Sequence, residues 1–383
     1  MPVSPRARCD RWWRNSAEGN SMSADSDRHS PAKGSAILGI ATVVPEHCLE
    51  QDSVKHKLRS LLPIPERRLD AVMALFDNAL VQRRFSVLPL EQLCVSRSLS
   101  ETMALYRENA IALGRRAAAD CLTASGVSAR AVDLIITVSC TGFMIPSLDA
   151  YLAQDLGFRP DVRRLPITEL GCGAGAAALG RAHDFLCGHP EAHVLIVAVE
   201  LPTLSFQRND ASTAQLVSTA LFGDGAAAVL LTGRPSGSGV TVLDAETHLF
   251  PDTLNLLGFD LHDDGLHVVL AKELPDTLRT AFGAVVERLL ARSGIARADV
   301  ECCVFHPGGT RILLAIEEAL GLDRTRTQPS WDVLREYGNM SSAAVLFVLE
   351  RCMKQLRPRP GACGLLGAFG PGLSADLCLL RWN

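Results

Sequence analysis

Two stretches of this chain are similar to one another: Glu169-Leu-Gly-Cys172-Gly-Ala-Gly-Ala-Ala-Ala-Leu179 and Glu336-Tyr-Gly-Asn339-Met-Ser-Ser-Ala-Ala-Val-Leu346. Two further pairs occur in the same order along the chain, namely Ser125-Gly-Val with Ser293-Gly-Ile and Phe222-Gly-Asp-Gly with Phe369-Gly-Pro-Gly. Such internal similarity indicates a duplicated unit. We therefore expect two related halves and a functional site where they meet.

Superposing the halves puts Cys172 opposite Asn339 and Cys140 near His306. A thiol, an imidazole and an amide then lie at one seam, and this combination is typical of nucleophilic acyl transfer. Each residue also has an ordinary structural explanation. Buried cysteines fill cores, His306 ends an apolar strand, and Asn339 suits a helix N-cap.

Length and composition restrict the class of protein. A chain of 383 residues, of which 48% are hydrophobic, is long enough for two domains with apolar cores. The net charge of -4, without a sustained run of Lys and Arg, argues against a nucleic-acid partner. No apolar run reaches the roughly 20 residues that a transmembrane helix requires, so we expect no membrane span.

The cysteines and the N-terminal segment predict the cellular context. The 12 cysteines form no CxxC pair and no cluster at zinc-ligand spacing, so we expect no metal site and a reducing cytoplasm. Residues 1–34 are rich in Ser, Arg, Asp and Gly and lack the apolar core of a signal peptide. We expect a disordered leader there, with Met22 as an alternative start of translation.

Apolar runs of strand length alternate with helical patterns in both halves, which predicts an α/β fold with a largely parallel sheet covered by helices. The expected strands are 36–44, 132–140, 165–169, 193–200, 226–231, 240–244, 300–305, 363–368 and 375–380. The expected helices are 65–80, 101–124, 147–156, 172–185, 275–291, 310–320 and 340–356. A linker with Gly and Pro at 233–239 separates an N-terminal half, 35–236, from a C-terminal half, 237–383.

Cys172 follows a predicted strand and begins a predicted helix. Unpaired backbone N–H groups and the helix dipole favour a negative charge at that position. With His306 nearby, this placement predicts a lowered thiol pKa and a reactive thiolate. The flanking Gly171, Gly173 and Gly175 would permit a tight turn and the close approach of a substrate thioester.

Five motifs, in the order seen here, resemble the chalcone synthase superfamily, the type III polyketide synthases. They are Cys140-Thr-Gly-Phe-Met-Ile-Pro146, Phe222-Gly-Asp-Gly-Ala226, His306-Pro-Gly-Gly309, Gly338-Asn-Met-Ser-Ser342 and Phe369-Gly-Pro-Gly372. The resemblance extends from about residue 36 to the C-terminus. It implies the thiolase fold, with duplicated αβαβα halves in five layers related by a pseudo-twofold axis. It also implies a homodimer without a metal or a redox cofactor.

The resemblance further implies the activity and the roles of the site residues. Cys172 would accept a starter acyl group from coenzyme A, with His306 and Asn339 as the other members of the catalytic triad. These two residues would also stabilise the enolate formed when malonyl-CoA loses carbon dioxide. Repeated condensation would extend the chain by two carbons per round, and the product would cyclise in the same cavity.

Other positions match the family's substrate-binding residues. Phe222 resembles the gatekeeping phenylalanine between the coenzyme A tunnel and the cavity. The second gate position carries Val268, which would widen the passage. The resemblance places Cys140, Ser205, Phe259 and Ser341 in the cavity wall, and Ile145 in the cavity of the neighbouring subunit.

Recognition of coenzyme A departs from the plant pattern, because residues 73–78 lack the expected basic side chains. Gly308, Gly309 and Arg311 match the tunnel. Arg83, Arg84 or Arg311 would then bind the phosphates, or an acyl carrier protein would deliver the donor.

The segments 200–210 and 216–228 resemble bacterial alkylresorcinol and alkylpyrone synthases, which start from long fatty acyl thioesters. The motif at Cys140 also resembles malonyl-primed tetrahydroxynaphthalene synthases. Two alternatives remain at this point: an enzyme like ketoacyl synthase III that condenses only once, and a catalytically silent scaffold with the thiolase fold.

Overall fold

The computed structural model describes residues 34–62, 65–234 and 239–383. The expected leader, apart from Gly34, and the middle of the expected linker lie outside these residues. The description below concerns the unit formed by residues 34–383.

Nine strands form one sheet in the order β11-β12-β13-β8-β1-β7-β6-β4-β5. The N-terminal half supplies β1 (Ser35–Val43), β4 (Leu134–Val138), β5 (Arg163–Ile167), β6 (His193–Glu200) and β7 (Gly225–Thr232). The C-terminal half supplies β8 (Val240–Leu249), β11 (Val300–Phe305), β12 (Cys363–Gly370) and β13 (Ser374–Trp382). The strands of the two halves follow the same order: β8, β13, β12 and β11 correspond to β1, β7, β6 and β4. Among the described strands of the C-terminal half, none corresponds to β5. The duplication seen in the sequence is therefore present in the topology.

The sheet is mixed, and the expectation of a largely parallel sheet is wrong. Strand β4 pairs in parallel with β5 and β6, and β11 pairs in parallel with β12. The other pairings, including β6 with β7 and β12 with β13, are antiparallel. The short connection between Gly370 and Ser374 leaves no room for a crossover, so β13 must return beside β12 in the opposite direction.

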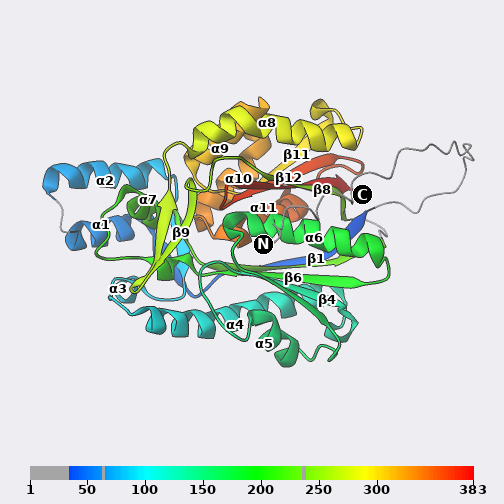
Figure 1. Cartoon of the computed structure of the whole chain (residues 1–383), viewed down its shortest axis with the longest axis horizontal. Helices are drawn as coiled ribbons and strands as arrows, with labels where there is room; N and C mark the ends of the chain where they lie inside the picture. The colour runs from blue at the N-terminus through cyan, green and yellow to red at the C-terminus, as the bar shows by residue number, and fades with distance from the viewer. Residues whose placement is uncertain (1–33, 63–64, 235–238) are drawn as a thin grey trace, which may run out of the picture. The chain divides into compact units, whose positions relative to one another are not determined.

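Helices cover both faces of each half and form the expected five layers (Figure 1). Helices α4 (Leu99–Ser125) and α5 (Leu148–Asp155) cover the outer face of the N-terminal strands. Helices α6 (Ala174–Gly188) and α11 (Ser341–Arg351) form the middle layer and contact each other and strands of both halves. Helices α8 (Leu274–Arg292), α9 (Thr310–Leu320) and α10 (Arg324–Tyr337) cover the C-terminal half.

The repeated motifs have matching backbone conformations. Gly126 and Gly294 follow α4 and α8 with φ values of +68° and +67°. Gly171 and Gly338 precede Cys172 and Asn339 with φ values of +52° and +72°. Left-handed backbone at equivalent positions explains why glycine stands in both copies.

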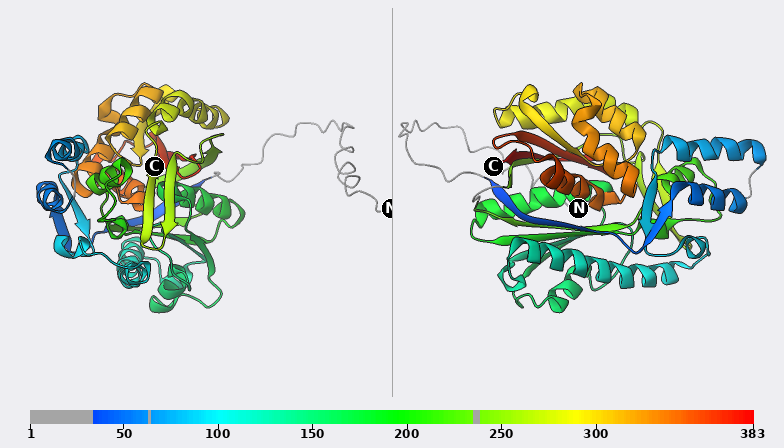
Figure 2. Two further views of the ribbon diagram at one scale, coloured as in Figure 1. Left: turned by 60° about the vertical axis from the view of Figure 1, so that its left-hand side comes forward. Right: turned by 180° about the vertical axis from the view of Figure 1, so that it is seen from behind.

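Several elements that the sequence did not predict surround the site. They are β2 (His47–Glu50), α1 (Gln51–Leu61), β3 (Arg83–Ser86), α3 (Leu90–Leu93), α7 (Thr213–Leu221), β9 (Leu257–His262) and β10 (Gly265–Leu270). Helix α2 (Glu66–Asn78) falls where a helix was expected. Figure 2 shows α1 and α2 at one end of the layers and the β9–β10 hairpin as a separate pair of strands.

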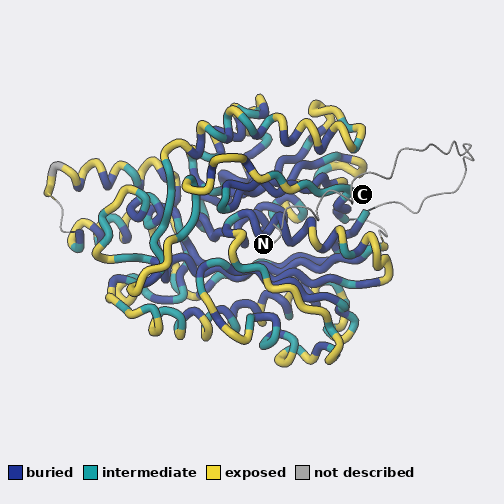
Figure 3. Tube along the Cα trace, viewed as in Figure 1, coloured by how far each residue is buried: buried dark blue, intermediate teal, exposed yellow. Residues whose placement is uncertain are grey.

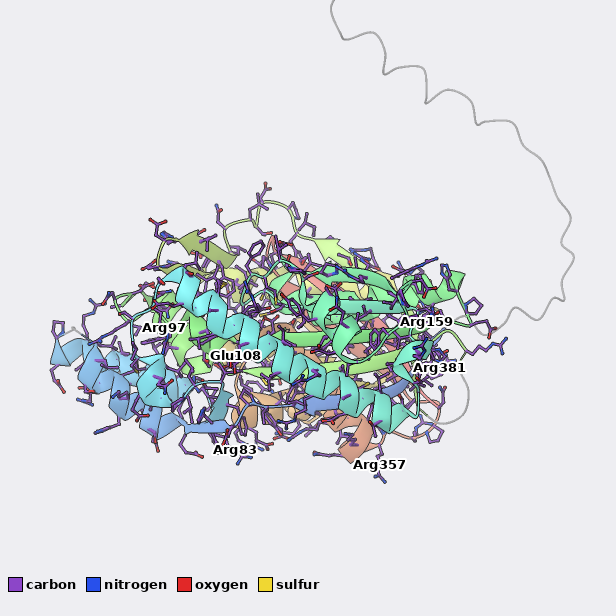
Figure 4. All side chains as sticks on the ribbon, turned by 90° about the horizontal axis from the view of Figure 1, so that it is seen from below. Arg83, Arg97, Glu108, Arg159, Arg357 and Arg381 are labelled. Atoms are coloured by element: carbon purple, nitrogen blue, oxygen red, sulfur yellow. The ribbon has the colours of Figure 1, made fainter. Side chains whose placement is uncertain are left out.

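Burial follows the layers: the strands and the middle helices are largely buried, and exposed residues lie on the outer turns (Figure 3). Helix α11 is buried continuously from Ser341 to Leu349. Among the described helices, none has the length and hydrophobicity needed to cross a bilayer. The arginines labelled in Figure 4 are spread along the face that carries α4 and do not form one basic strip.

Candidate active site

Cys172 lies in a single 3-10 turn, Gly171–Gly173, that continues into α6. This position at the start of a helix is the one that the sequence predicted. Gly171 has positive φ, and a Cβ atom there would lie 2.5 Å from Cδ of Pro371. Only glycine fits this turn, which fixes Cys172 at the helix N-terminus.

The next two glycines bring the halves together and do not make room for substrate. A Cβ atom on Gly173 would lie 3.0 Å from the backbone nitrogen of Gly370, and one on Gly175 would lie 2.2 Å from the carbonyl oxygen of Ser342. The expectation that these glycines admit a thioester is wrong, because the opposite half fills the space beside them.

His306 directly follows β11, and its backbone N–H donates to the carbonyl of Gly367 on β12 at 2.9 Å. Its side chain is 2% exposed. Within the described residues, neither ring nitrogen has a hydrogen-bond partner. The imidazole is therefore held at the carboxyl end of two parallel strands with both nitrogens available to a reacting group.

Asn339 lies between α10 and α11, and its side chain bonds in two directions. Nδ2 donates to the carbonyl of Gly308 at 3.2 Å, and Oδ1 accepts from the backbone N–H of Ser341 at 2.8 Å. The amide therefore binds the loop that follows His306 and also holds the first residue of α11. Asn339 therefore stabilises the start of α11, as a helix-capping residue would, and it also lies where the two halves meet.

Cys172, His306 and Asn339 line one cavity between the two halves, referred to below as the catalytic cavity. The other predicted residues that line it are Phe222, Cys140, Phe259, Val268, Ser341 and Gly308. Ser205 does not line it; its hydroxyl donates to the carbonyl of Pro202 at 2.7 Å and faces a neighbouring cavity. Ile145 is 77% exposed, and it does not line the catalytic cavity of its own chain.

The protonation states differ from those expected. Burial raises the pKa of the Cys172 thiol to about 11, although hydrogen bonds with Ser341 and Asn339 oppose this effect. Burial lowers the pKa of His306 to about 3. Desolvation thus outweighs the helix N-terminus, and the favoured pair at pH 7 is a neutral thiol with a neutral imidazole.

The Ser341 hydroxyl lies between two sulfur atoms, 3.5 Å from Sγ of Cys172 and 3.2 Å from Sγ of Cys140. Ser341 has a φ of +46°, which residues other than glycine seldom adopt. This conformation begins α11 and turns the Ser341 side chain toward both thiols.

Glu200 is a site residue that sequence reasoning missed. It is fully buried at the end of β6, and burial raises its pKa. Its Oε2 accepts from the backbone N–H of Cys140 at 3.1 Å and from the Thr141 hydroxyl at 2.8 Å, while Oε1 accepts from the Ser342 hydroxyl. The carboxylate thus joins the Cys140 segment to the start of α11. The sequence contained one signal for this role, because Glu200 is a charged residue at the end of a largely apolar strand.

Phe259 and Val268 face each other across the β9–β10 hairpin and line the catalytic cavity together. The expected gate position therefore lies in the cavity wall, with a side chain smaller than an aromatic ring. Phe222 ends α7 as its C-cap residue.

Of the three arginines expected to bind coenzyme A, two are exposed and one is buried. Arg311 is exposed in the first turn of α9, two residues after Gly309, and Arg83 is exposed on the face shown in Figure 4. Arg84 is 2% exposed, and its guanidinium donates to carbonyl groups at the end of α7. Binding of a coenzyme A phosphate by Arg84 is therefore ruled out by its burial.

A second cavity, called here the side cavity, adjoins the catalytic cavity. Its walls are mostly apolar and include Leu49, Val54, Leu58, Leu90, Leu93 and Phe206. Pro202, Ser218 and Phe222 line both cavities, so Phe222 lies at their border.

Comparison with known proteins covers both halves. The model of the N-terminal domain of chalcone and stilbene synthases matches residues 23–235, and the model of the C-terminal domain matches residues 241–382. A 1,3,6,8-tetrahydroxynaphthalene synthase from Streptomyces peucetius subsp. caesius is 39% identical over 361 residues, which cover 93% of this chain and 96% of the relative. A phloroglucinol synthase from Pseudomonas fluorescens is 33% identical over 340 residues, which cover 88% and 97%.

A solved structure agrees with these sequence matches. The crystal structure of the 1,3,6,8-tetrahydroxynaphthalene synthase from Streptomyces coelicolor A3(2), a bacterial type III polyketide synthase, has a TM-score of 0.87 and 34% identity, covering 91% of this chain and 99% of that chain. The chain therefore belongs to the chalcone and stilbene synthase family, and it is a type III polyketide synthase, an acyltransferase of the thiolase fold.

Proposed function

We propose that this enzyme loads a long-chain acyl starter from coenzyme A onto Cys172, extends it with malonyl-CoA and cyclises the product to an alkylresorcinol or an alkylpyrone. The side cavity is the observation that carries this proposal. The two cavities share Ser218 and Phe222 as lining residues, so a tail attached to Cys172 would run past these side chains to reach the apolar walls. Burying each methylene group there contributes about 0.8 kcal/mol, so affinity should rise with tail length until the cavity is full.

Loading requires the Cys172 sulfur to attack the thioester carbonyl of the starter. His306 would act as the base, because both of its ring nitrogens are buried without a partner among the described residues, and the unprotonated one can accept the thiol proton. The bond from the acyl carbon to Cys172 forms as its bond to the coenzyme A sulfur breaks. The proton then passes from His306 to the departing thiolate.

Extension requires donors for the negative charge that develops when malonyl-CoA loses carbon dioxide. Nδ2 of Asn339 carries two N–H groups, of which one bonds to Gly308; the other would turn from the Cys172 sulfur to the thioester oxygen. Nε2–H of His306 supplies a second donor. The stabilised enolate carbon then attacks the acyl group on Cys172, the bond to Sγ breaks, and the elongated chain remains on coenzyme A.

Coenzyme A would enter beside Gly308 and Gly309, with Arg311 near its phosphates. Arg311 is exposed at the start of a helix, where backbone N–H groups also favour an anion. A carrier-bound donor remains the alternative, because residues 73–78 lack basic side chains. Measured rates with acyl-CoA and with acyl carrier protein would separate the two.

The enzyme would work as a homodimer in a reducing cytoplasm. Phe143 and Ile145 are 64% and 77% exposed on one segment, and exposed apolar side chains that lie together are typical of protein interfaces. Ile145 would reach into the catalytic cavity of the second subunit. Cys94, Cys121 and Cys303 are buried thiols outside any disulfide, which fits a reducing compartment.

A malonyl-primed tetrahydroxynaphthalene synthase is the second candidate, because relatives with 39% and 35% identity carry that name. Mass spectrometry of products from malonyl-CoA alone, and from malonyl-CoA with acetyl-, hexanoyl-, decanoyl- or palmitoyl-CoA, tests both candidates. We expect alkylated cyclic products with the longer starters. A naphthalene product from malonyl-CoA, with no acyl starter incorporated, would support the second candidate. A linear product extended only once would indicate chemistry of the ketoacyl synthase III type.

A further inference from the structure

The side cavity contains a buried amide oxygen without a partner. Gln215 lies on α7, is 2% exposed and lines the side cavity. Across the residues that the structure describes, no group donates a hydrogen bond to its Oε1. A buried amide oxygen normally has a donor, so this one is available to a donor on a substrate that occupies the side cavity.

A second buried glutamine nearby shows that the protein can satisfy such an amide. Nε2 of Gln51 donates to the carbonyls of Phe76 at 3.2 Å and Ala220 at 3.1 Å, and its Oε1 accepts from the guanidinium of Arg84. Gln51 therefore has a complete set of partners within the protein. The unpaired oxygen of Gln215 is specific to its position in the side cavity.

Arg84 also lines the side cavity and has one unpaired donor among the described residues. Its Nη1 donates to the carbonyls of Thr219 at 2.5 Å and Phe222 at 3.1 Å, and its Nη2 donates to Ala220 at 2.8 Å. Its Nε has no partner in this part of the protein. Gln215 and Thr219, whose carbonyl Arg84 binds, belong to successive turns of α7, since the Thr219 hydroxyl donates to the Gln215 carbonyl at 2.7 Å.

The chemistry of these two atoms defines the group that would pair with both. Nε of Arg84 donates, and Oε1 of Gln215 accepts. A hydroxyl accepts one hydrogen bond and donates another, whereas a ketone or a carboxylate only accepts and a methylene does neither. We infer that the preferred starter of this enzyme is a hydroxylated fatty acyl group, and that Gln215 and Arg84 bind its hydroxyl in the side cavity. This inference rests on the proposed use of an acyl starter.

Gln215 is therefore a specificity-determining residue, and Arg84 has two functions. Three of its N–H bonds hold the end of α7, including the carbonyl of Phe222, while Nε is left for the substrate. Burial lowers the pKa of Arg84 only to about 9, so the guanidinium stays charged and donates strongly at pH 7.

The test compares kcat/KM for decanoyl-CoA with kcat/KM for monohydroxylated decanoyl-CoA, with the hydroxyl placed at mid-chain or at the chain end. We expect the wild-type enzyme to prefer one hydroxylated form by about tenfold or more, the range of a buried hydrogen bond to a charged group. Gln215→Leu should remove this preference and raise kcat/KM for plain decanoyl-CoA. Gln154→Leu, the same change at an exposed position of α5, should leave both values unchanged.

The outcomes separate this inference from the proposed function. Equal use of plain and hydroxylated starters by the wild-type enzyme would overturn the inference while leaving an acyl-primed synthase. A hydroxyl preference that persists in Gln215→Leu would overturn the role of Gln215. Failure to use any acyl-CoA would instead remove the proposed function. If Gln215→Leu melts early by circular dichroism, Gln215→Met replaces it with a side chain of similar length.

Discussion

Phe222 and Asn339 come from different halves and are joined through their main chains as an isolated parallel β-bridge. The N–H of Asn339 donates to the carbonyl of Leu221 at 2.8 Å, and the N–H of Gly223 donates to the carbonyl of Asn339 at 3.1 Å. The side chain at the border of the two cavities is thereby fixed to the residue that supplies the amide. A shift of one displaces the other.

The two halves hold each other in the same way. A Cβ atom on Gly223 would lie 2.4 Å from the carbonyl oxygen of Tyr337, and one on Gly370 would lie 2.3 Å from that of Leu170. Each Phe-Gly loop thus packs on the turn that presents Cys172 or Asn339 from the opposite half. Because each half supplies one Phe-Gly loop and one such turn, the Phe-Gly motif and the turn motif both occur twice in the sequence.

The division of labour in the site predicts the behaviour of Cys172→Ala. Polyketide formation should fall by at least about 1,000-fold because no sulfur holds the starter, while slow decarboxylation of malonyl-CoA continues on His306 and Asn339. Release of acetyl-CoA measures the remaining step. Cys48→Ala, at an exposed position, is the control. Loss of decarboxylation in a folded variant would contradict the assigned roles.

The raised pKa of Cys172 predicts how its alkylation depends on pH. Because the thiol is the favoured form up to pH of about 11, the rate of alkylation by iodoacetamide should rise about tenfold per pH unit from 7 to 10. Mass spectrometry of the peptide that contains Cys172 measures this rate. A rate that is already constant near pH 7 would show that a thiolate and imidazolium pair exists before substrate binds.

The small side chain at the gate position predicts the effect of Val268→Phe. An aromatic ring paired across the hairpin with Phe259 would fill part of the catalytic cavity. The substitution should lower kcat/KM for decanoyl-CoA and palmitoyl-CoA more than for acetyl-CoA. Val269→Phe, the next residue on β10, which lies outside that cavity wall, serves as the control. An unchanged preference across starter lengths would refute the role of Val268.

The contact between the middle helices predicts that Gly175→Ala is destabilising. Its Cβ atom would meet the backbone of Ser342, which cannot move aside as a flexible side chain can. We expect a loss of about 1–3 kcal/mol in the free energy of unfolding, measured by denaturant titration. Gly188→Ala at the other end of α6 meets nothing within 4 Å and should be neutral or slightly stabilising. Similar effects of the two changes would disprove the close contact.

Some elements could be predicted closely because their signal is local. Strand β6 and helix α9 have the predicted bounds, 193–200 and 310–320, since a continuous apolar run and a regular helical spacing depend only on neighbouring residues. The β9–β10 hairpin was missed because its residues are only partly buried and show no clear alternation. Helix α7 was missed because its short apolar pattern is ambiguous.

The sequence by itself determined the duplication and the family, and it singled out Cys172, His306 and Asn339 as candidates for the site, because repeated motifs keep their order and spacing along the chain. Only the tertiary structure decided that burial raises the pKa of the Cys172 thiol, that Arg84 is buried, and that Ser205 and Gln215 line a second cavity. Burial is the physical reason. The burial of a side chain depends on contacts with segments that are far apart in the chain. A local sequence pattern therefore does not reveal how far a side chain is shielded from water.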